Sequence, residues 1–343
     1  MNLLKKAVLT SAALVLVVGA AQARDQVRIV GSSTVYPFSS YVAEELGATT
    51  KFPTPVVEST GSGGGMKLFC SGNGMNTPDI TNASRPMKEK EWKLCQKNGV
   101  TDITGVMIGY DGIVFAQSNE NRPVNFTKKQ LLLAVAQKVP VNGKLVMNPY
   151  KNWSDIDPSL PNREIVIYGP PTSSGTRDAF EELVMQKITK KMPGYGKKKY
   201  STIRQDGPYI PSGENDNLIV QKLEQNKKAF GIFGYGFLAE NADKIAASKI
   251  NGVIASPATV ADASYPIARS LYFYIKNSHV AKVKAIKPYV DMFLSDNMSG
   301  TDGVLSEIGL IPASDDIRAK IKASVSKFTP LTLEMVKAKT VIK

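Results

Sequence analysis

Residues 27–46 read VRIVGSSTVYPFSSYVAEEL, and this stretch contains the order of elements on which the fold prediction rests. Its first four residues are mostly β-branched and predict a strand, while its second half predicts a helix. Between the two lies the turn Gly31-Ser32-Ser33-Thr34. The same order of strand, Ser/Thr/Gly turn and helix returns twice, with the turns STGSGGG at 59–65 and TSSGTR at 172–177.

Short β-branched runs alternate with helical patterns along the rest of the chain. The expected strands are 27–30, 55–58, 79–83, 106–108, 113–117, 165–168, 230–235 and 268–275. The expected helices are 37–46, 88–98, 127–136, 176–188, 217–225, 282–295 and 317–324, with another that opens near 65. We expect a tight turn at 109–112 and a long surface loop at 195–217. This alternation predicts an α/β fold with mostly parallel sheets.

The N-terminus has the layout of a signal peptide. Lys5 and Lys6 precede an apolar run at 7–21, and Ala21-Gln22-Ala23 resembles a small-residue cleavage site. The run is shorter than the ~20 residues of a membrane-spanning helix, although an uncleaved anchor is the alternative. We therefore expect a signal peptide at 1–23 and a mature, periplasmic chain that begins near Arg24. A lipid anchor is not expected, because no Cys lies near the cleavage point.

Composition and charge narrow the class of partner. The chain has 343 residues, 43% of them hydrophobic, and a formal net charge of +13, which attracts anions without specifying which one. The Lys and Arg residues are spread along the chain without an aromatic-basic module, so nucleic acid is not an expected partner. The Lys-rich stretch 187–199 is expected to be a solvated surface.

The Cys and His content limits the chemistry further. Cys70 and Cys95 predict a disulfide in an oxidising compartment, with two separate buried thiols as the alternative. The single His, His279, is expected on the solvated surface. Two Cys and one His cannot build a four-ligand Cys/His zinc site, and we expect neither a metal nor a cofactor.

The three Ser/Thr/Gly turns predict an anion site. A helix N-terminus offers free N–H groups and the positive end of its dipole, glycines allow close approach, and hydroxyls add neutral donors. Any one turn is more simply a helix cap. Three turns of one composition favour a shared anion site, with donors from Ser33, Thr34, Ser62, Gly63, Ser174, Gly175 and Thr176.

Charged residues lie beside these turns. Either Arg85 or Arg177 could bind two oxygens of a phosphate with its planar guanidinium. Asp111 could accept a hydrogen bond from a protonated phosphate oxygen, which fully ionised sulfate lacks. The alternative for Asp111 is an ordinary turn residue.

Six short motifs follow one another along the chain. They are GSSTVYP at 31–37, GSGGGMK at 61–67, ASRP at 83–86, YDG at 110–112, SGTR at 174–177 and FGIFGY at 230–235. In this order they resemble the periplasmic phosphate-binding proteins of phosphate-specific ABC transporters. The resemblance covers most of the mature chain.

The resemblance implies a fold and a set of ligand positions. The fold is a two-lobed type II periplasmic binding protein, each lobe a mostly parallel sheet flanked by helices, with two hinge strands between the lobes. Lobe one would comprise 24–110 and 265–343, and lobe two 111–264. The matching binding positions are Thr34, Ser62, Ser84, Arg85, Asp111, Ser174, Gly175 and Thr176.

The chain departs from the family pattern at two positions. Some relatives have Asp where Arg85 stands, so the proton-acceptor role would pass to Asp111. Some also have Arg four residues before the Ser of the third turn, where this chain has Pro170. Arg177 or Arg85 would then have to supply the positive charge.

The implied function is high-affinity capture of inorganic phosphate in the periplasm and delivery to a membrane ABC permease, by a monomer that is not an enzyme. One alternative keeps the fold and changes the ligand to sulfate, molybdate or a phosphonate. Another is a secreted hydrolase of phosphate esters, which the lone His279 and the lack of metal ligands disfavour.

Overall fold

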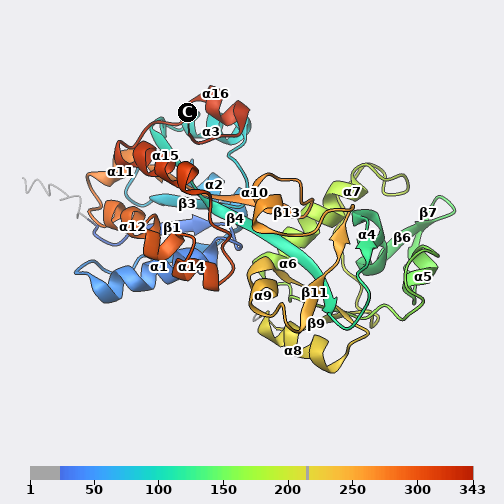
Figure 1. The fold of residues 1–343 in the computed structure, drawn as a ribbon. Helices are drawn as coiled ribbons and strands as arrows, with labels where there is room; N and C mark the ends of the chain where they lie inside the picture. The colour runs from blue at the N-terminus through green and yellow to red at the C-terminus, as the bar shows by residue number, and fades with distance from the viewer. Residues whose placement is uncertain (1–23, 214–215, 343) are drawn as a thin grey trace, which may run out of the picture.

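The computed structural model describes residues 24–213 and 216–342, so the signal peptide predicted at 1–23 lies outside the described residues. The chain forms a nine-stranded mixed sheet and two small two-stranded sheets, with helices packed around them (Figure 1). Among the described residues, no helix is both long and apolar enough to cross a bilayer.

Most strands are short, and β4 and β13 are much longer than the rest. The strands are β1 Arg28–Gly31, β2 Val56–Ser59, β3 Ile80–Ala83, β4 Ile103–Ser118, β5 Asn125–Phe126, β6 Lys138–Val141, β7 Lys144–Met147, β8 Ile167–Gly169, β9 Tyr209–Pro211, β10 Phe230–Gly234, β11 Ile245–Ala247, β12 Lys249–Ile250 and β13 Ala268–Lys276. The helices are α1 Tyr36–Thr49, α2 Gly61–Phe69, α3 Glu89–Lys97, α4 Lys128–Val135, α5 Trp153–Ile156, α6 Gly175–Phe180, the π-helical segment η1 Glu181–Gln186, α7 Lys187–Thr189, α8 Asn217–Gln225, α9 Tyr235–Glu240, α10 Pro257–Ala261, α11 Asn277–Val280, α12 Ile286–Phe293, α13 Asp296–Ser299, α14 Val304–Glu307, α15 Asp315–Ser326 and α16 Leu333–Ala338.

The large sheet has the order β2-β1-β3-β13-β4-β10-β8-β9, with β11 also paired to β4. β1 runs parallel to β2 and β3 in one lobe, and β8 runs parallel to β9 and β10 in the other. Two strands, β4 and β13, pair antiparallel where the lobes join. This confirms the predicted two-lobed α/β fold, and each lobe has a parallel core extended by antiparallel crossing strands.

Buried apolar side chains form separate cores in the two lobes. The second-lobe core uses residues between Tyr110 and Ile267, joined by Ile311 and Ala313. The first-lobe cores use residues from 27–108 and 271–341. The sequence-based limits 24–110, 111–264 and 265–343 stay a prediction.

The tight turn predicted at 109–112 is wrong, because β4 continues through it as one strand. Gly109 has a φ of +143°, which a side chain rarely tolerates, and a Cβ there would lie 2.6 Å from the Ile311 carbonyl oxygen. Opposite it, the register of β13 shifts between Leu271 and Tyr272. A β-bulge therefore replaces the turn, and Asp111 lies in extended backbone.

Two other expected elements also differ. The stretch 195–217, predicted as a surface loop, contains β9 and buries Tyr195, Ile203 and Tyr209 in the second-lobe core. The helix predicted at 282–295 is shorter than expected, because α12, Ile286–Phe293, is the helix within that range. Apolar residues spaced among lysines and glycines carry too little periodicity to be recognised as core.

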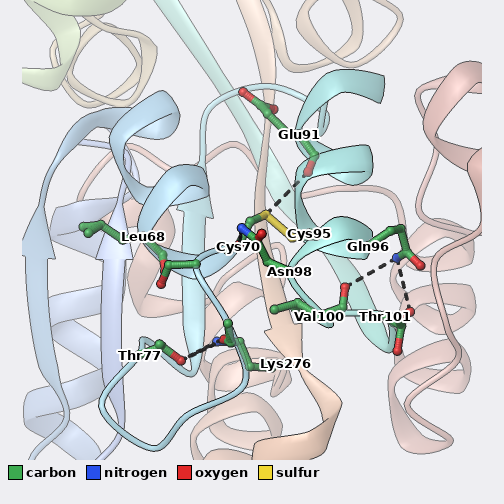
Figure 2. Close-up of a disulfide and its surroundings, with 12 residues drawn as sticks. Leu68, Cys70, Thr77, Glu91, Cys95, Gln96, Asn98, Val100, Thr101 and Lys276 are labelled. Carbon is green, nitrogen blue, oxygen red and sulfur yellow. Dashed lines mark hydrogen bonds between the residues drawn. A yellow bond between two sulfur atoms is a disulfide. The ribbon is translucent and has the colours of Figure 1, made fainter.

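The predicted disulfide is confirmed. Cys70 and Cys95 are bonded, and the described residues contain no free cysteine. Figure 2 shows the bond between the end of α2 and the side of α3. The bridge closes a loop of 25 residues, which contributes about 3 kcal/mol in the chain-entropy description.

The predicted surface position of His279 is wrong, because the ring is completely buried. Its Nδ1 lies 2.6 Å from Asp79 Oδ1, and its Nε2 lies 3.0 Å from the Asn73 carbonyl oxygen. Both partners only accept hydrogen bonds, so the ring makes both bonds only when both nitrogens carry hydrogen. Asp79 also accepts from Arg24 and from the Arg28 amide.

His279→Ala should lower the free energy of unfolding by about 3 kcal/mol, because it removes a partner of a fully buried carboxylate. Urea unfolding of the purified mature protein measures this loss. Ser278→Ala is the matched control, since Ser278 is exposed on the same short helix. A loss below about 1 kcal/mol for His279→Ala would show that Arg24 and backbone amides alone satisfy Asp79.

Candidate anion site between the lobes

A cavity of about 550 Å³ lies where the two lobes meet. The turn before α1 lines it from the first lobe, and the turn before α6 lines it from the second. Asp111 of β4 and Asp216, just before α8, also line the cavity. Most of the polar residues predicted from the sequence therefore come together in this region.

The first and third turns touch each other across the lobes. Ser33 Oγ donates to Asp178 Oδ2 at 2.7 Å, and Thr34 Oγ1 donates to the Gly175 carbonyl oxygen at 3.2 Å. A Cβ on Gly175 would lie 2.6 Å from the Thr34 backbone nitrogen, so glycine is required for this approach. Ser174 caps α6, with its Oγ accepting from the Thr176 amide at 3.2 Å.

The second turn reaches the site through a pair of serines. Ser62 Oγ lies 3.1 Å from Ser84 Oγ and accepts from the Ser84 amide at 3.0 Å. Gly63 is in the first turn of α2 and is exposed. Ser62 and Ser84 thus form one hydrogen-bonded unit at the first-lobe side of the site.

Arg269 of β13 contacts residues from each of these parts of the site, although none of the sequence motifs includes it. Its Nε donates to Asp111 Oδ2 at 3.2 Å, and its Nη1 donates to Ser84 Oγ at 3.1 Å. Its Nη2 donates to Thr34 Oγ1 and, at 3.4 Å, to the Gly175 carbonyl oxygen. The side chain is only 8% exposed, so this guanidinium is the buried positive charge at the junction of the lobes.

The pairing register of the hinge strands β4 and β13 explains why the sequence alone does not place Arg269 at the site. Arg269 pairs directly with Asp111 across β13 and β4. In the sequence it is a lone charge near the start of an apolar strand, far from every Ser/Thr/Gly turn. That position, a charged residue shortly before a run of apolar strand residues, is the one weak signal the sequence contains.

Arg85 and Arg177, the two guanidiniums proposed from the sequence, are engaged elsewhere. Arg85 binds both carboxylate oxygens of Glu91, at 2.9 and 2.7 Å. Burial alone would raise the pKa of Glu91, but the hydrogen bonds from Arg85 hold it below its usual value. The structure does not bring Arg85 to the cavity, and its role in binding stays a prediction.

Arg177 points into the second lobe. Its Nε donates to Glu181 Oε1 at 2.7 Å, and its guanidinium lies 4.8 Å from the centre of the Tyr209 ring. It is buried against this ring although it begins the helix after the third turn. Its role as a ligand likewise stays a prediction.

Two carboxyl groups face the cavity. Asp111 is paired with Arg269, whereas Asp216 is 5% exposed and its carboxyl group accepts a hydrogen bond from the Gly234 amide at 3.0 Å. Burial raises the pKa of Asp216 to about 6; the Gly234 hydrogen bond opposes this rise, and the charge of Asp111 adds to it.

These groups suit a small, partly protonated oxyanion. Hydroxyls and a guanidinium donate to bare oxygens, while a carboxylate accepts from a protonated one. Within the described residues, no group of three or more His, Cys, Asp or Glu could hold a metal ion.

A family profile and several known proteins match most of this chain in sequence. A family profile described as the PBP superfamily domain matches residues 17–297. Protein SphX of Synechococcus elongatus is 31% identical over 289 residues, which cover 82% of this chain and 76% of SphX. The phosphate-binding protein PstS of Staphylococcus saprophyticus is 31% identical over 272 residues, which cover 78% of this chain and 75% of PstS.

A solved structure agrees with these sequence relatives. A possible phosphate binding protein from Planctomyces limnophilus superimposes with a TM-score of 0.72 at 27% identity, over 89% of this chain and 98% of that one. The matches in sequence extend across both lobes and the crossing strands. The chain therefore belongs to the PBP superfamily, in the family that includes SphX and the phosphate-binding protein PstS.

Proposed function

We propose that this protein captures inorganic phosphate in the periplasm with high affinity and delivers it to a membrane ABC permease. The observation that carries the proposal is the Arg269–Asp111 pair, which places one cationic donor and one acceptor where the turns of both lobes meet. Phosphate at neutral pH has bare oxygens for the donor and a protonated oxygen for the acceptor. The relatives called phosphate-binding protein support the same ligand.

The proposed ligand contacts come from both lobes. Thr34, Ser62 and Ser84 would donate from the first lobe, and Ser174, Gly175 and Thr176 from the second. Arg269 replaces Arg85 and Arg177 as the charged donor in this proposal, since it already contacts Thr34, Ser84 and the Gly175 carbonyl. An anion that contacts both lobes favours their closed arrangement.

Binding and release need no bond chemistry, so we propose a carrier and not an enzyme. The buried His279 pairs with Asp79, which excludes it as the base of a serine at the cavity. The periplasmic location rests on the signal peptide predicted at 1–23. A phosphate-ester hydrolase remains the rival class for the same anion site.

Isothermal titration calorimetry of residues 24–343 with phosphate, sulfate and arsenate tests the proposal. We expect phosphate and arsenate to bind, because both carry a proton at neutral pH, and sulfate to bind far more weakly. Sulfate affinity equal to that of phosphate would overturn the assignment of the ligand. Turnover of a chromogenic phosphate ester that Ser62→Ala abolishes would overturn the non-enzyme assignment.

A further inference from the structure

The second lobe ends in a hairpin that exposes apolar side chains along β7. β6 and β7 pair only with each other and are joined by Asn142-Gly143, both at positive φ. The side chains of Leu145, Val146 and Met147 on β7 are 41, 38 and 59% exposed. Val146 pairs with Val139, which is fully buried in the second-lobe core, so the exposed apolar surface of the hairpin lies along β7 near its tip.

A lysine-rich loop lies against the base of this hairpin. Tyr195 Oη donates to the Lys138 carbonyl at 2.8 Å, and the Lys138 amide donates to Tyr200 Oη at 3.1 Å. Figure 1 shows the loop after α7 and the β6–β7 hairpin at the same end of the second lobe. We call residues 138–147 and 190–200 together the basic tip.

The basic tip carries positive charge without acidic residues. Its lysines, all exposed, are Lys138, Lys144, Lys190, Lys191, Lys197, Lys198 and Lys199. The flanking sequence is also free of acids, since neither 121–154 nor 183–205 contains Asp or Glu. In the part of the chain that the structure describes, no ion pair joins these seven lysines to a carboxylate.

We propose that the basic tip binds the surface of an anionic lipid bilayer. Lysines near such a surface are attracted to the headgroups, and a short apolar segment between them can enter the interfacial region. The seven exposed lysines have no acidic residue among them in the basic tip, so their charge complements a layer of anionic headgroups. The stretch 187–199, expected from the sequence to be an inert solvated surface, therefore has a ligand.

The binding test uses residues 24–343 and two kinds of vesicle. One contains phosphatidylglycerol and phosphatidylcholine in equal amounts, and the other contains phosphatidylcholine alone. We expect the protein to sediment with the anionic vesicles and not with the neutral ones, and the binding to weaken as salt is added. No difference between the two vesicles would overturn the proposal.

Charge-reversal variants distinguish binding through the basic tip from binding through the overall positive charge of the protein. The triple variant Lys197→Glu, Lys198→Glu and Lys199→Glu should lower the partition coefficient at least about a hundredfold, from about fivefold for each lysine. The matched control reverses Lys282, Lys284 and Lys320, which are exposed in the first lobe. Equal losses for both triples would overturn the proposal, because general charge would then explain the binding.

Insertion of the exposed apolar residues of β7 into the bilayer is measured separately. Leu145→Trp should show a blue-shifted emission that brominated lipids quench, and Leu145→Ser with Met147→Ser should weaken binding without changing its salt dependence. Unquenched emission on bound protein would overturn insertion. Phosphate calorimetry of every variant should match the parent, since the basic tip is separate from the cavity. Variants that still bind anionic vesicles but no longer bind a detergent-solubilised permease would overturn the membrane as the partner.

Discussion

Arg269→Met is expected to weaken phosphate binding about a thousandfold. The substitution removes a buried cation that hydrogen-bonds groups of both lobes beside the cavity, and it leaves Asp111 as an unpaired carboxylate beside an anion. Truncating one member of a buried charge pair costs about 2–5 kcal/mol, which is between about thirtyfold and several thousandfold in affinity. Calorimetry or a competition assay with labelled phosphate measures the loss.

Arg85→Met is the matched control for this prediction. Its guanidinium is already neutralised by Glu91, so phosphate affinity should fall less than about threefold even if stability drops. The double variant Arg269→Met with Asp111→Asn should recover part of the affinity, because the unpaired charge is gone. A larger loss for Arg85→Met than for Arg269→Met would restore Arg85 as the ligand.

Asp111→Asn should narrow the preference for phosphate over sulfate by about a hundredfold or more. The carboxylate accepts from the phosphate hydroxyl and repels a bare sulfate oxygen, whereas the amide can donate to sulfate. An unsatisfied or repelled polar group costs about 1–3 kcal/mol on each side of this comparison. Titrations with both anions at pH 8 give the ratio, and an unchanged ratio would move the acceptor role to Asp216.

The protonation of Asp216 is expected to change the preference for phosphate over sulfate with pH. Because burial raises its pKa to about 6, the side chain gains a proton as the pH falls through 6 and can then donate to an anion. Sulfate binding should therefore strengthen on acidification, by at most about tenfold per pH unit for one coupled proton. Asp216→Asn should flatten the profile between pH 7 and 5, and a profile that keeps its slope would exclude this group.

The sequence predicted what depends on neighbours along the chain. Each Ser/Thr/Gly turn and the helix after it are local, so the cavity-lining residues Thr34 and Ser174 could be named in advance. The Cys70–Cys95 pair also followed from count and compartment. Local patterns and a family resemblance were thus sufficient for the α/β fold and for most hydroxyl residues that line the cavity, while their role as donors to a ligand stays a prediction.

The groups that were missed depend on partners distant in sequence. Arg269 is 158 residues from Asp111, and His279 is 200 residues from Asp79. Their neighbours are set by β13, which pairs with both β3 and β4. The same pairing kept β4 as one bulged strand where Gly109 and Gly112 had suggested a turn. Charged residues near the ends of β13 could be placed only once that register was known.

The position of β13 also sets the order in which the protein can be completed as it is made. β13 follows every other strand in the sequence, yet it lies between β3 and β4 in the sheet. A chain that emerges N-terminus first therefore leaves one edge of β3 unpaired until residue 276 has appeared, while all strands of the second lobe are already available. Cys70 and Cys95 both lie N-terminal to β13, so they emerge before it does. Their disulfide can hold α2 and α3 together before β13 has paired. The first lobe, which is completed last, thus has a covalent restraint early.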